Sequence, residues 1–356
     1  MLKVSTVNFC GERIFCGIDV HKKSWRVNIR SEEFELEAYS QDPDEEQLLL
    51  HLRDRYPGGS YEVAYEAGFS GFSLQRRLKQ RGVNCMVINP GDVPTSDKDK
   101  QRKSDRVDAR KISRELSKGS LSGIYVPDEQ MEYARSLVRQ RRRLVEDQTR
   151  CKSRIWHLLM FSGLQLQQDM EHRHWSGRFV QGLQDMDCGN RHLRRTLDLM
   201  VEEYLQVRNL LLQATRQVRE LSRELPYATR IELLQSIPGI GLVSAMVLLT
   251  ELQDMRRFST LDKLCGYAGI VPDLSGSGEQ EVVKGITHRS NNYLRTTIVE
   301  SSWVIIRKDP AMLMAYKKYC KRMHTNKAII KIARHLLSRI RYVWLQNKPY
   351  ETGITG

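Results

Sequence analysis

The order of strand-like and helix-like segments in the first 118 residues most constrains the fold of this chain. Residues 13–20, 25–29 and 34–39 have strand character, and helix-like and strand-like segments then alternate. These later segments, in order, are 44–55 (helix), 61–66 (strand), 70–81 (helix) and 85–88 (strand). A chain with this order forms a mixed sheet flanked by helices. We therefore predict an α/β domain over residues 12–122.

The remainder of the chain is predicted to be mainly helical. Residues 128–164 and 191–225 have the pattern of long helices, which predicts an antiparallel pair or coiled coil for assembly within a region spanning 123–225. A third region, 226–348, is predicted to be a mainly α domain. Its expected helices lie at 242–252, 291–306 and 328–346, with a glycine-rich segment after the first of them.

The third region opens with Ile237-Pro238-Gly239-Ile240-Gly241 between two apolar segments. This pattern predicts a helix-hairpin-helix. Gly239 and Gly241 would let backbone N–H groups approach a phosphate without interference from side chains. The alternative is a tight turn between helices that binds no ligand.

The charge balance of the chain favours a polyanionic partner. Lysine and arginine total 57 against 43 acids, a net charge of +14. No apolar stretch is long enough to span a membrane, and the N-terminus lacks a secretory signal. Seven cysteines without a CxxC pair argue against a disulfide framework or structural zinc. We expect a cytoplasmic protein with no membrane partner.

Four acids form the candidate catalytic set. Asp19 and Glu66 end predicted strands, and Asp105 and Asp108 lie three residues apart near the start of a predicted helix. Carboxylates are the ligands that Mg²⁺ or Mn²⁺ prefers, and paired metals support phosphoryl transfer. The alternatives are helix-dipole acids for Asp105 and Asp108 and a surface acid for Glu66. The placement of all four at element ends favours the metal site.

Three motifs in order carry a resemblance to a known family. They are Gly17-Ile18-Asp19-Val20-His21-Lys22, Tyr65-Glu66-Ala67-Gly68, and Lys103-Ser104-Asp105-Arg106-Val107-Asp108-Ala109. The order of strands and acids resembles the ribonuclease H-like fold of the resolvase RuvC. The motifs resemble those of the DEDD transposases of the insertion-sequence-110 group, the bridge-RNA-guided recombinases. This resemblance implies a metal at the four acids, donor and target DNA, a noncoding bridge RNA, and a dimer or tetramer of the chain.

The resemblance extends to the segment 265–295, where the family carries a serine before a glycine that is taken as the nucleophile. By that position Ser277 is the candidate, with Ser275 as the runner-up. The resemblance also suggests that Arg289 and Arg295 stabilise phosphate charge, and that His288 is a base or binds the backbone. Without it, a flexible Ser/Gly loop is the better interpretation. Ser290 stands where many relatives are expected to have glycine.

Two basic segments supply candidate phosphate contacts. Residues 98–114 hold eight Lys or Arg against three acids, and residues 135–154 hold eight against two. A solvated helix face is the alternative to a nucleic-acid contact for such runs. No base-reading module is recognisable, which is consistent with sequence choice by a bound RNA. The candidate contacts are Lys103, Arg106, Arg110, Arg139 and Arg142, with Gly239, Gly241, Arg289 and Arg295 from the third region.

The predicted function is that of a DNA recombinase or transposase. It would use divalent metal, a serine that forms a covalent DNA intermediate, and a guide RNA. One competing hypothesis is a metal-dependent nuclease or Holliday-junction resolvase, in which water attacks and no covalent adduct forms. The other is a non-enzymatic nucleic-acid-binding protein that retains the fold, in which the four acids are dispensable.

Overall fold

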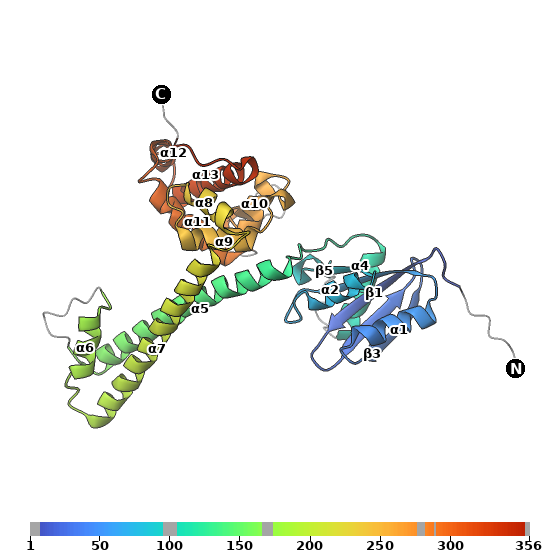
Figure 1. The fold of residues 1–356 in the computed structure, drawn as a ribbon, viewed down its shortest axis with the longest axis horizontal. Coiled ribbons are helices and arrows are strands. Elements are labelled where there is room, and N and C mark those ends of the chain that lie inside the picture. The colour runs from blue at the N-terminus through green and yellow to red at the C-terminus, as the bar shows by residue number, and fades with distance from the viewer. Residues whose placement is uncertain (1–7, 95–104, 166–173, 276–281, 288–289, 353–356) are drawn as a thin grey trace. The chain divides into compact units, whose positions relative to one another are not determined.

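The computed structural model describes residues 8–94, 105–165, 174–275, 282–287 and 290–352, with the backbone alone for 105–107, 272–275 and 282–286. The chain divides into two compact units, Met1–Val126 and Pro127–Gly356. The first unit is an α/β domain, and the second contains the long helices together with a helical core (Figure 1). This confirms the predicted α/β domain followed by a mainly helical region.

A five-stranded mixed sheet forms the centre of the first unit. The strand order is β3-β2-β1-β4-β5, with β1, β4 and β5 parallel and β2 and β3 antiparallel. The strands are β1 (Arg13–Val20), β2 (Trp25–Arg30), β3 (Glu35–Gln41), β4 (Ser60–Glu66) and β5 (Asn84–Ile88). The helices are α1 (Glu45–Arg55), α2 (Ser73–Gln80) and α4 (Asp105–Ser117), with a short 3₁₀ turn η1 (Pro90–Asp92).

Both faces of this sheet are buried, so β1 is apolar at nearly every position. Ile14 and Ile18 pack on one face with leucines of α1 and α2. Phe15 and Ala64 pack on the other face with Ile112 of α4. Because successive side chains of a strand point to opposite faces, this alternation fixes which residues of β1 and β4 face α4.

Helix α4 approaches the backbone of β1 at Gly17. A Cβ atom at Gly17 would lie 2.3 Å from the carbonyl oxygen of Ala109 and 2.5 Å from the amide nitrogen of Ser113. Only glycine permits this approach, because both obstructing atoms belong to the helix backbone. Ser113 Oγ also donates a 2.5 Å hydrogen bond to Oδ1 of the buried Asn28 in β2. These contacts fix where α4 crosses the sheet.

The second unit begins with two long antiparallel helices, α5 and α7 (Figure 1). Arg154 of α5 pairs with Glu203 of α7 at 2.6 Å, and Arg141 Nε donates to Thr215 Oγ1 at 2.9 Å. The residue numbers of the partners on α7 rise as those on α5 fall, so the two helices run antiparallel. The helices of this unit are α5 (Glu129–Phe161), α6 (Gly177–Asp185), α7 (Arg191–Leu221), α8 (Ala228–Gln235), α9 (Leu242–Leu252), α10 (Leu261–Ala268), α11 (Asn292–Ile305), α12 (Pro310–Cys320) and α13 (Thr325–Gln346).

A C-terminal core joins the later helices of this unit. Leu248 of α9, Ile298 of α11 and Leu337 of α13 are almost completely buried within it. A short 3₁₀ turn η2 (Met255–Arg257) follows α9, and a hairpin of β6 (Pro272–Ser275) and β7 (Val282–Ile286) precedes α11. The hairpin connects α10 to α11, and the Ser/Gly segment lies between its two strands in sequence.

Three short helices of this unit were not predicted from the sequence. These helices, α6, α10 and α12, have only 9, 8 and 11 residues. Each is nevertheless marked by a side-chain cap, in which Ser176, Thr260 or Asp309 accepts a hydrogen bond from a first-turn N–H group. These capping residues were therefore the sequence signal for helices that are too short to show a clear apolar periodicity.

Candidate catalytic carboxylates and nucleic-acid contacts

Asp19 and Glu66 lie near the carboxyl ends of neighbouring parallel strands. The last recorded β1–β4 pair is Ile18 with Tyr65, so Asp19 and Glu66 are the next residues in the same register. Gly17 and Ala64, two residues earlier, face α4. Asp19 and Glu66 therefore project from the same face of the sheet, because side chains two apart on a strand share a face.

The first turn of α4 supplies the other two acids. Ala109 and Ser113 lie over Gly17, whereas Leu116 belongs to the cluster around Phe15, so α4 runs opposite to β1. Its N-terminal turn, with Asp105 and the half-buried Asp108, therefore extends toward the end of β1 where Asp19 lies. The topology brings all four predicted positions to one end of the sheet.

An all-carboxylate donor set suits a hard divalent cation such as Mg²⁺ or Mn²⁺. Among the side chains that the structure describes, which exclude that of Asp105, no group of three or more Asp, Glu, His or Cys is arranged to hold a metal ion. The donor chemistry therefore fits the metal, while the ligand geometry stays a prediction.

His21 is a residue of this region to which the sequence analysis gave no role. Its Nε2 lies 3.1 Å from Oδ2 of Asp19. The side chain follows Asp19 by two residues, just beyond the end of β1. A histidine in this position can orient the carboxylate, and its spacing within the first motif was the signal that could have identified it.

The candidate nucleophile lies outside the described residues. Ser277 falls between β6 and β7, and His288 and Arg289 also belong to stretches that are not described. Ser275 is the last residue of β6, where it pairs with Val282 through the backbone. The predictions for these four residues therefore stay predictions.

Arg295 ties the start of α11 to the end of the hairpin segment. Its Nη1 donates to the carbonyl oxygen of Thr287 at 3.0 Å, and its Nη2 donates to Oδ1 of Asn292 at 3.0 Å. Nearby, Gly269 has a φ of +70° at the end of α10, and a Cβ there would lie 2.1 Å from the Cβ of Ser290. Ser290 is thus packed tightly against a glycine on the other side of the hairpin.

Arg139 is exposed in part, but its guanidinium is held by a buried acid. Glu251 at the end of α9 is fully buried and accepts hydrogen bonds from Nε and Nη2 of Arg139 at 2.7 and 2.8 Å. Asn291, the N-cap of α11, donates a third bond to Glu251 at 2.7 Å. The hydrogen bonds to Glu251 raise the pKa of Arg139 above its ordinary value. This gives Arg139 a structural role in joining α5 to α9 and α11.

Two further predicted contacts also have acidic partners. Arg142 Nε donates to Glu146 at 2.8 Å, one turn along α5. Arg110 Nε lies 2.5 Å from Oε2 of Glu35 in β3, although most of its side chain is exposed. Lys103 lies outside the described residues, and only the backbone of Arg106 is described.

The turn between α8 and α9 places its two glycines differently. Gly239 has a φ of +93°, and a Cβ there would lie 2.8 Å from the carbonyl oxygen of Ser301 in α11. Gly241 is the N-cap of α9, and a Cβ there would meet nothing within 4 Å. Packing on α11 accounts for Gly239 without a ligand, so the helix-hairpin-helix stays a prediction that rests on Gly241.

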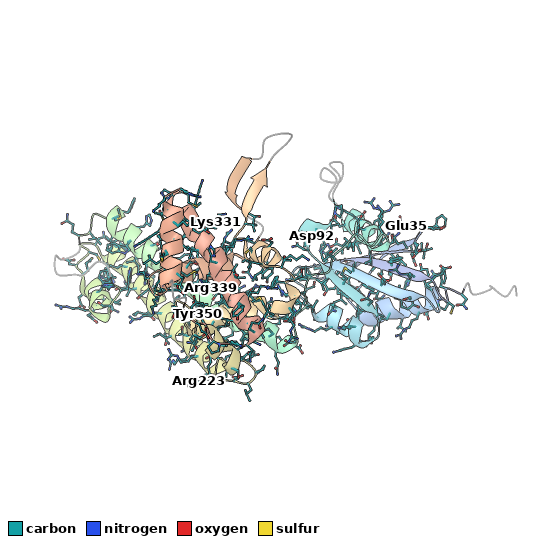
Figure 2. All side chains as sticks on the ribbon, turned by 90° about the horizontal axis from the view of Figure 1, so that it is seen from above. Glu35, Asp92, Arg223, Lys331, Arg339 and Tyr350 are labelled. Carbon is teal, nitrogen blue, oxygen red and sulfur yellow. The ribbon has the colours of Figure 1, made fainter. Side chains whose placement is uncertain are left out.

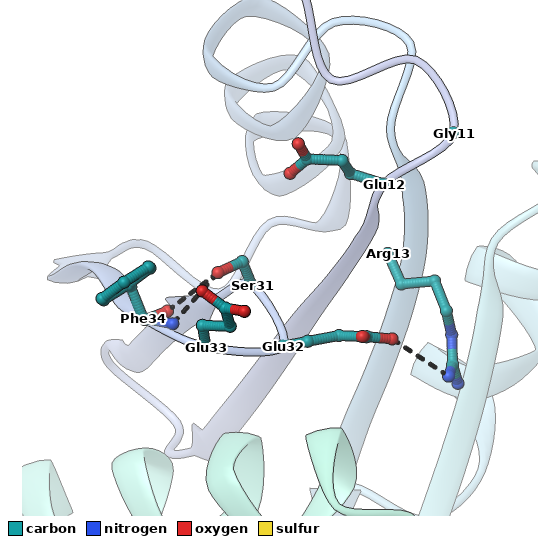
Figure 3. Close-up of a pocket in the computed structure, with 7 residues that line it drawn as sticks. All are labelled: Gly11, Glu12, Arg13, Ser31, Glu32, Glu33 and Phe34. Atoms are coloured by element: carbon teal, nitrogen blue, oxygen red, sulfur yellow. Dashed lines mark hydrogen bonds and ion pairs between the residues drawn. The ribbon is translucent and has the colours of Figure 1, made fainter.

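A cavity of about 450 Å³ in the first unit, whose lining Figure 3 shows, contains none of the four candidate metal ligands. Glu12, Glu32 and Glu33 line it with Arg13, which lies 3.6 Å from Glu32. Arg13 begins β1, whereas Asp19 lies near its other end. Its three carboxylates against one guanidinium make the cavity unsuitable for a phosphate.

The fold and the placement of the acids define a two-unit protein whose first unit presents carboxylates at the ends of parallel strands. Comparison with known proteins identifies its family. A model described as a transposase matches residues 16–162, and one described as the transposase IS116/IS110/IS902 family matches residues 231–317. The chain belongs to this family of transposases. The first match spans all four acids, and the second spans Ser277.

Curated relatives agree with this assignment. The chain is 30% identical over 239 residues to the Sinorhizobium fredii protein y4qE, an alignment that covers 67% of this chain and 57% of that protein. It is 28% identical to the transposase for insertion sequence element IS1533 of Leptospira borgpetersenii, over 68% and 71% of the two chains. The transposase for IS1111A of Coxiella burnetii is 24% identical over 76% and 74%. No helix in the described part of the chain is long and apolar enough to cross a membrane.

Proposed function

We propose that this protein is a DNA transposase that exchanges strands through a metal-dependent carboxylate site and a serine nucleophile. The observation that carries the proposal is the convergence of Asp19, Glu66 and the first turn of α4 at one end of the sheet. The strand order β3-β2-β1-β4-β5 supports a ribonuclease H-like fold for this unit. A net charge of +14 suits a nucleic-acid substrate.

The acids and the serine have distinct roles in the proposed chemistry. Asp19, Glu66, Asp105 and Asp108 would hold Mg²⁺ or Mn²⁺, which when bound stabilises negative charge on a phosphodiester. Ser277 Oγ attacks the phosphorus of the DNA backbone, and a Ser–O–P bond forms as the bond from phosphorus to the sugar oxygen breaks. The serine proton passes to a base, for which His288 is the candidate, and the released sugar oxygen takes up a proton.

The covalent intermediate accounts for strand exchange without hydrolysis. A hydroxyl of a second strand attacks the same phosphorus and releases the serine, so the number of phosphodiester bonds is unchanged and no nucleotide cofactor is consumed. In a dimer or tetramer, the acids of one copy would act with the serine of another. A bound noncoding RNA would select donor and target DNA in the cytoplasm of a prokaryotic cell.

Substitution of the serine tests the chemistry directly. Ser277→Ala should abolish the covalent protein–DNA adduct while leaving DNA binding intact, whereas Ser275→Ala should retain the adduct. Asp19→Asn and Glu66→Gln should also abolish it, as should removal of divalent metal. An adduct that persists in Ser277→Ala would place the nucleophile elsewhere. Metal-dependent cleavage by the wild type without any covalent adduct would favour the competing hypothesis of a metal-dependent nuclease or resolvase, in which water attacks.

The RNA is tested by what copurifies with the protein. Sequencing of nucleic acid bound to protein purified from its native host should reveal one discrete noncoding species with segments that match two DNA sites. Heterogeneous RNA that salt removes without loss of DNA cleavage would contradict guidance. It would leave the proposed carboxylate and serine chemistry intact.

A further inference from the structure

The segment 310–350 is basic and contains no acid. It contains ten lysines and arginines and no aspartate or glutamate, in a protein whose net charge is +14. The cations are Lys317, Lys318, Lys321, Arg322, Lys327, Lys331, Arg334, Arg339, Arg341 and Lys348. A cation of this segment therefore either pairs with an acid from elsewhere in the fold, as Arg334 does with Asp262, or keeps its charge for solvent or a bound anion.

Helix α13 presents part of this charge on a single face. Ile332, Leu336 and Ile340 of the helix are buried in the C-terminal core. The opposite face carries a line of exposed residues three or four apart, which are Lys327, Lys331, His335, Ser338 and Tyr342. Figure 2 shows Lys331 and Arg339 on this helix, with Tyr350 beyond its end. Residues four apart on a helix rise about 6 Å along it, so Lys327 and Lys331 continue a line of positive charge.

A cavity of about 660 Å³ lies at the C-terminal end of this line. His335, Arg339 and Tyr342 of α13 line it together with Lys348, Tyr350 and Glu351 of the segment that follows. Tyr342 is 61% exposed, so its ring is open to a ligand. The cavity thus combines two cations, one acid and an accessible aromatic ring.

The wall of the cavity formed by Tyr350 is fixed by its own contacts. The backbone N–H of Tyr350 donates to Ser236 Oγ at 2.8 Å, and its hydroxyl donates to the buried carboxylate of Asp309. The guanidinium of Arg339 lies 5.6 Å from the centre of the Tyr350 ring. The Tyr350 wall of the cavity is therefore held in place by contacts within the protein.

The cations of the cavity keep their charge available. Within the described residues, neither Arg339 nor Lys348 forms an ion pair, whereas Arg334 pairs with Asp262. Burial lowers the pKa of His335, and the neighbouring Arg339, Arg334 and Lys331 lower it further. The contribution of the three cations, which is smaller than that of burial, reflects the positive charge beside the cavity.

We propose that this cavity binds an unpaired nucleotide of single-stranded nucleic acid. Arg339 and Lys348 contact the phosphate, and the base stacks on Tyr342, while Lys331 and Lys327 contact phosphates further along the strand. The aromatic ring favours a nucleotide over inorganic phosphate as the ligand, because phosphate has no base that could stack on Tyr342. The inference goes beyond the proposed strand-transfer chemistry and does not depend on it, because it concerns binding alone.

Binding of labelled oligonucleotides to the full-length protein tests the proposal. The background carries Asp19→Asn, so that cleavage does not interfere. The probes are short oligodeoxyuridine and oligouridine, which differ only in the sugar, and their binding is followed by fluorescence anisotropy. Tyr342→Ala should weaken binding about tenfold with little change in salt dependence, since it removes stacking. Lys348→Gln should weaken binding and reduce the slope of log affinity against log salt by about 0.7. Preference for either probe identifies the sugar that the site accepts.

Matched controls separate the cavity from general surface charge. Arg223→Gln removes an exposed cation, and Tyr133→Ala removes an exposed tyrosine, both remote from the cavity in sequence and outside its lining. Both should bind the probes as the parent does. Unchanged affinity in both Tyr342→Ala and Lys348→Gln would overturn the proposal. The proposal would also be overturned if Tyr342→Ala and Lys348→Gln lost no more affinity for the probes than the control variants do. Competition with the probes by anionic phosphatidylserine vesicles, if it depended on Tyr342, would likewise overturn it.

Discussion

Substitution of Arg139 tests whether this residue stabilises the fold or contacts nucleic acid. Glu251 is fully buried and accepts three hydrogen bonds, two of them from Arg139. Arg139→Ala would leave this carboxylate buried, with Asn291 as its remaining side-chain donor in the described part of the chain. Loss of one partner of a buried ion pair costs about 3–5 kcal/mol. The Arg139 side chain is 47% exposed, so water can replace part of the guanidinium, and we expect the lower end, about 3 kcal/mol.

Hydrogen exchange of the α9 amides measures this loss where it occurs. A local destabilisation of about 3 kcal/mol accelerates exchange about a hundredfold, because each 1.4 kcal/mol is a factor of ten. Arg150→Ala is the matched control, since Arg150 pairs with Asp147 on the exposed surface of α5. That substitution should change the exchange rate by less than about fivefold, as expected for a surface pair.

A double substitution tests the reasoning about the buried charge. Arg139→Met combined with Glu251→Leu removes both charges, and such apolar replacements of a buried pair are often neutral or stabilising. Exchange in α9 should therefore return most of the way to that of the wild type. Unchanged α9 exchange in Arg139→Ala, together with a lower salt slope for DNA binding, would refute the structural role and restore the predicted phosphate contact.

Two further substitutions test the first unit. Gly17→Ala should displace α4 and lower the free energy of unfolding of this unit by about 1–3 kcal/mol in urea, because the new methyl group meets backbone atoms of Ala109 and Ser113. The control Gly68→Ala should be tolerated, because a Cβ there meets nothing within 4 Å. Equal stability of the two variants would contradict the packing argument. Burial raises the pKa of Glu115, but hydrogen bonds from Ser120, Arg114 and Lys118 outweigh burial, so its net pKa is lowered. Its contribution to stability is therefore present above its unfolded pKa and lost as pH falls through the folded pKa. Glu115→Gln should be less stable than wild type at neutral pH and should converge with it in acid, and a pH-independent difference in urea midpoints would count against this assignment.

Apolar patterning was sufficient to predict the first unit, for an identifiable reason. The segment 13–20 is apolar on both faces because α1 and α2 cover one side of the sheet and α4 covers the other. Such a strand stands out in sequence even without alternation. The parallel register of β1 and β4 then brings Asp19 beside Glu66, which follows from their positions at strand ends.

Contacts between distant segments were beyond the reach of the sequence. Nothing in a pattern of residues links Arg139 with Glu251, which are separated by 112 positions. Gly17 could be read as part of a motif, but its necessity comes from the backbone of α4, almost a hundred residues later. The same holds for Gly239, whose packing partner is Ser301 in α11. Long-range packing decides the role of each of these residues.

The ion pairs also show how basic residues should be weighed as nucleic-acid contacts. Among the predicted contacts, Arg110, Arg139 and Arg142 each have a carboxylate as a partner. Only the partner of Arg142, four residues away, was visible in sequence. The segment 310–350 holds no acid at all, and Arg339 and Lys348 within it form no ion pair in the described part of the chain. A phosphate gains most from a cation that no carboxylate already neutralises. Cations that no carboxylate neutralises therefore mark a candidate phosphate-binding surface better than the number of cations does, and in the described part of this chain Arg339 and Lys348 meet that condition.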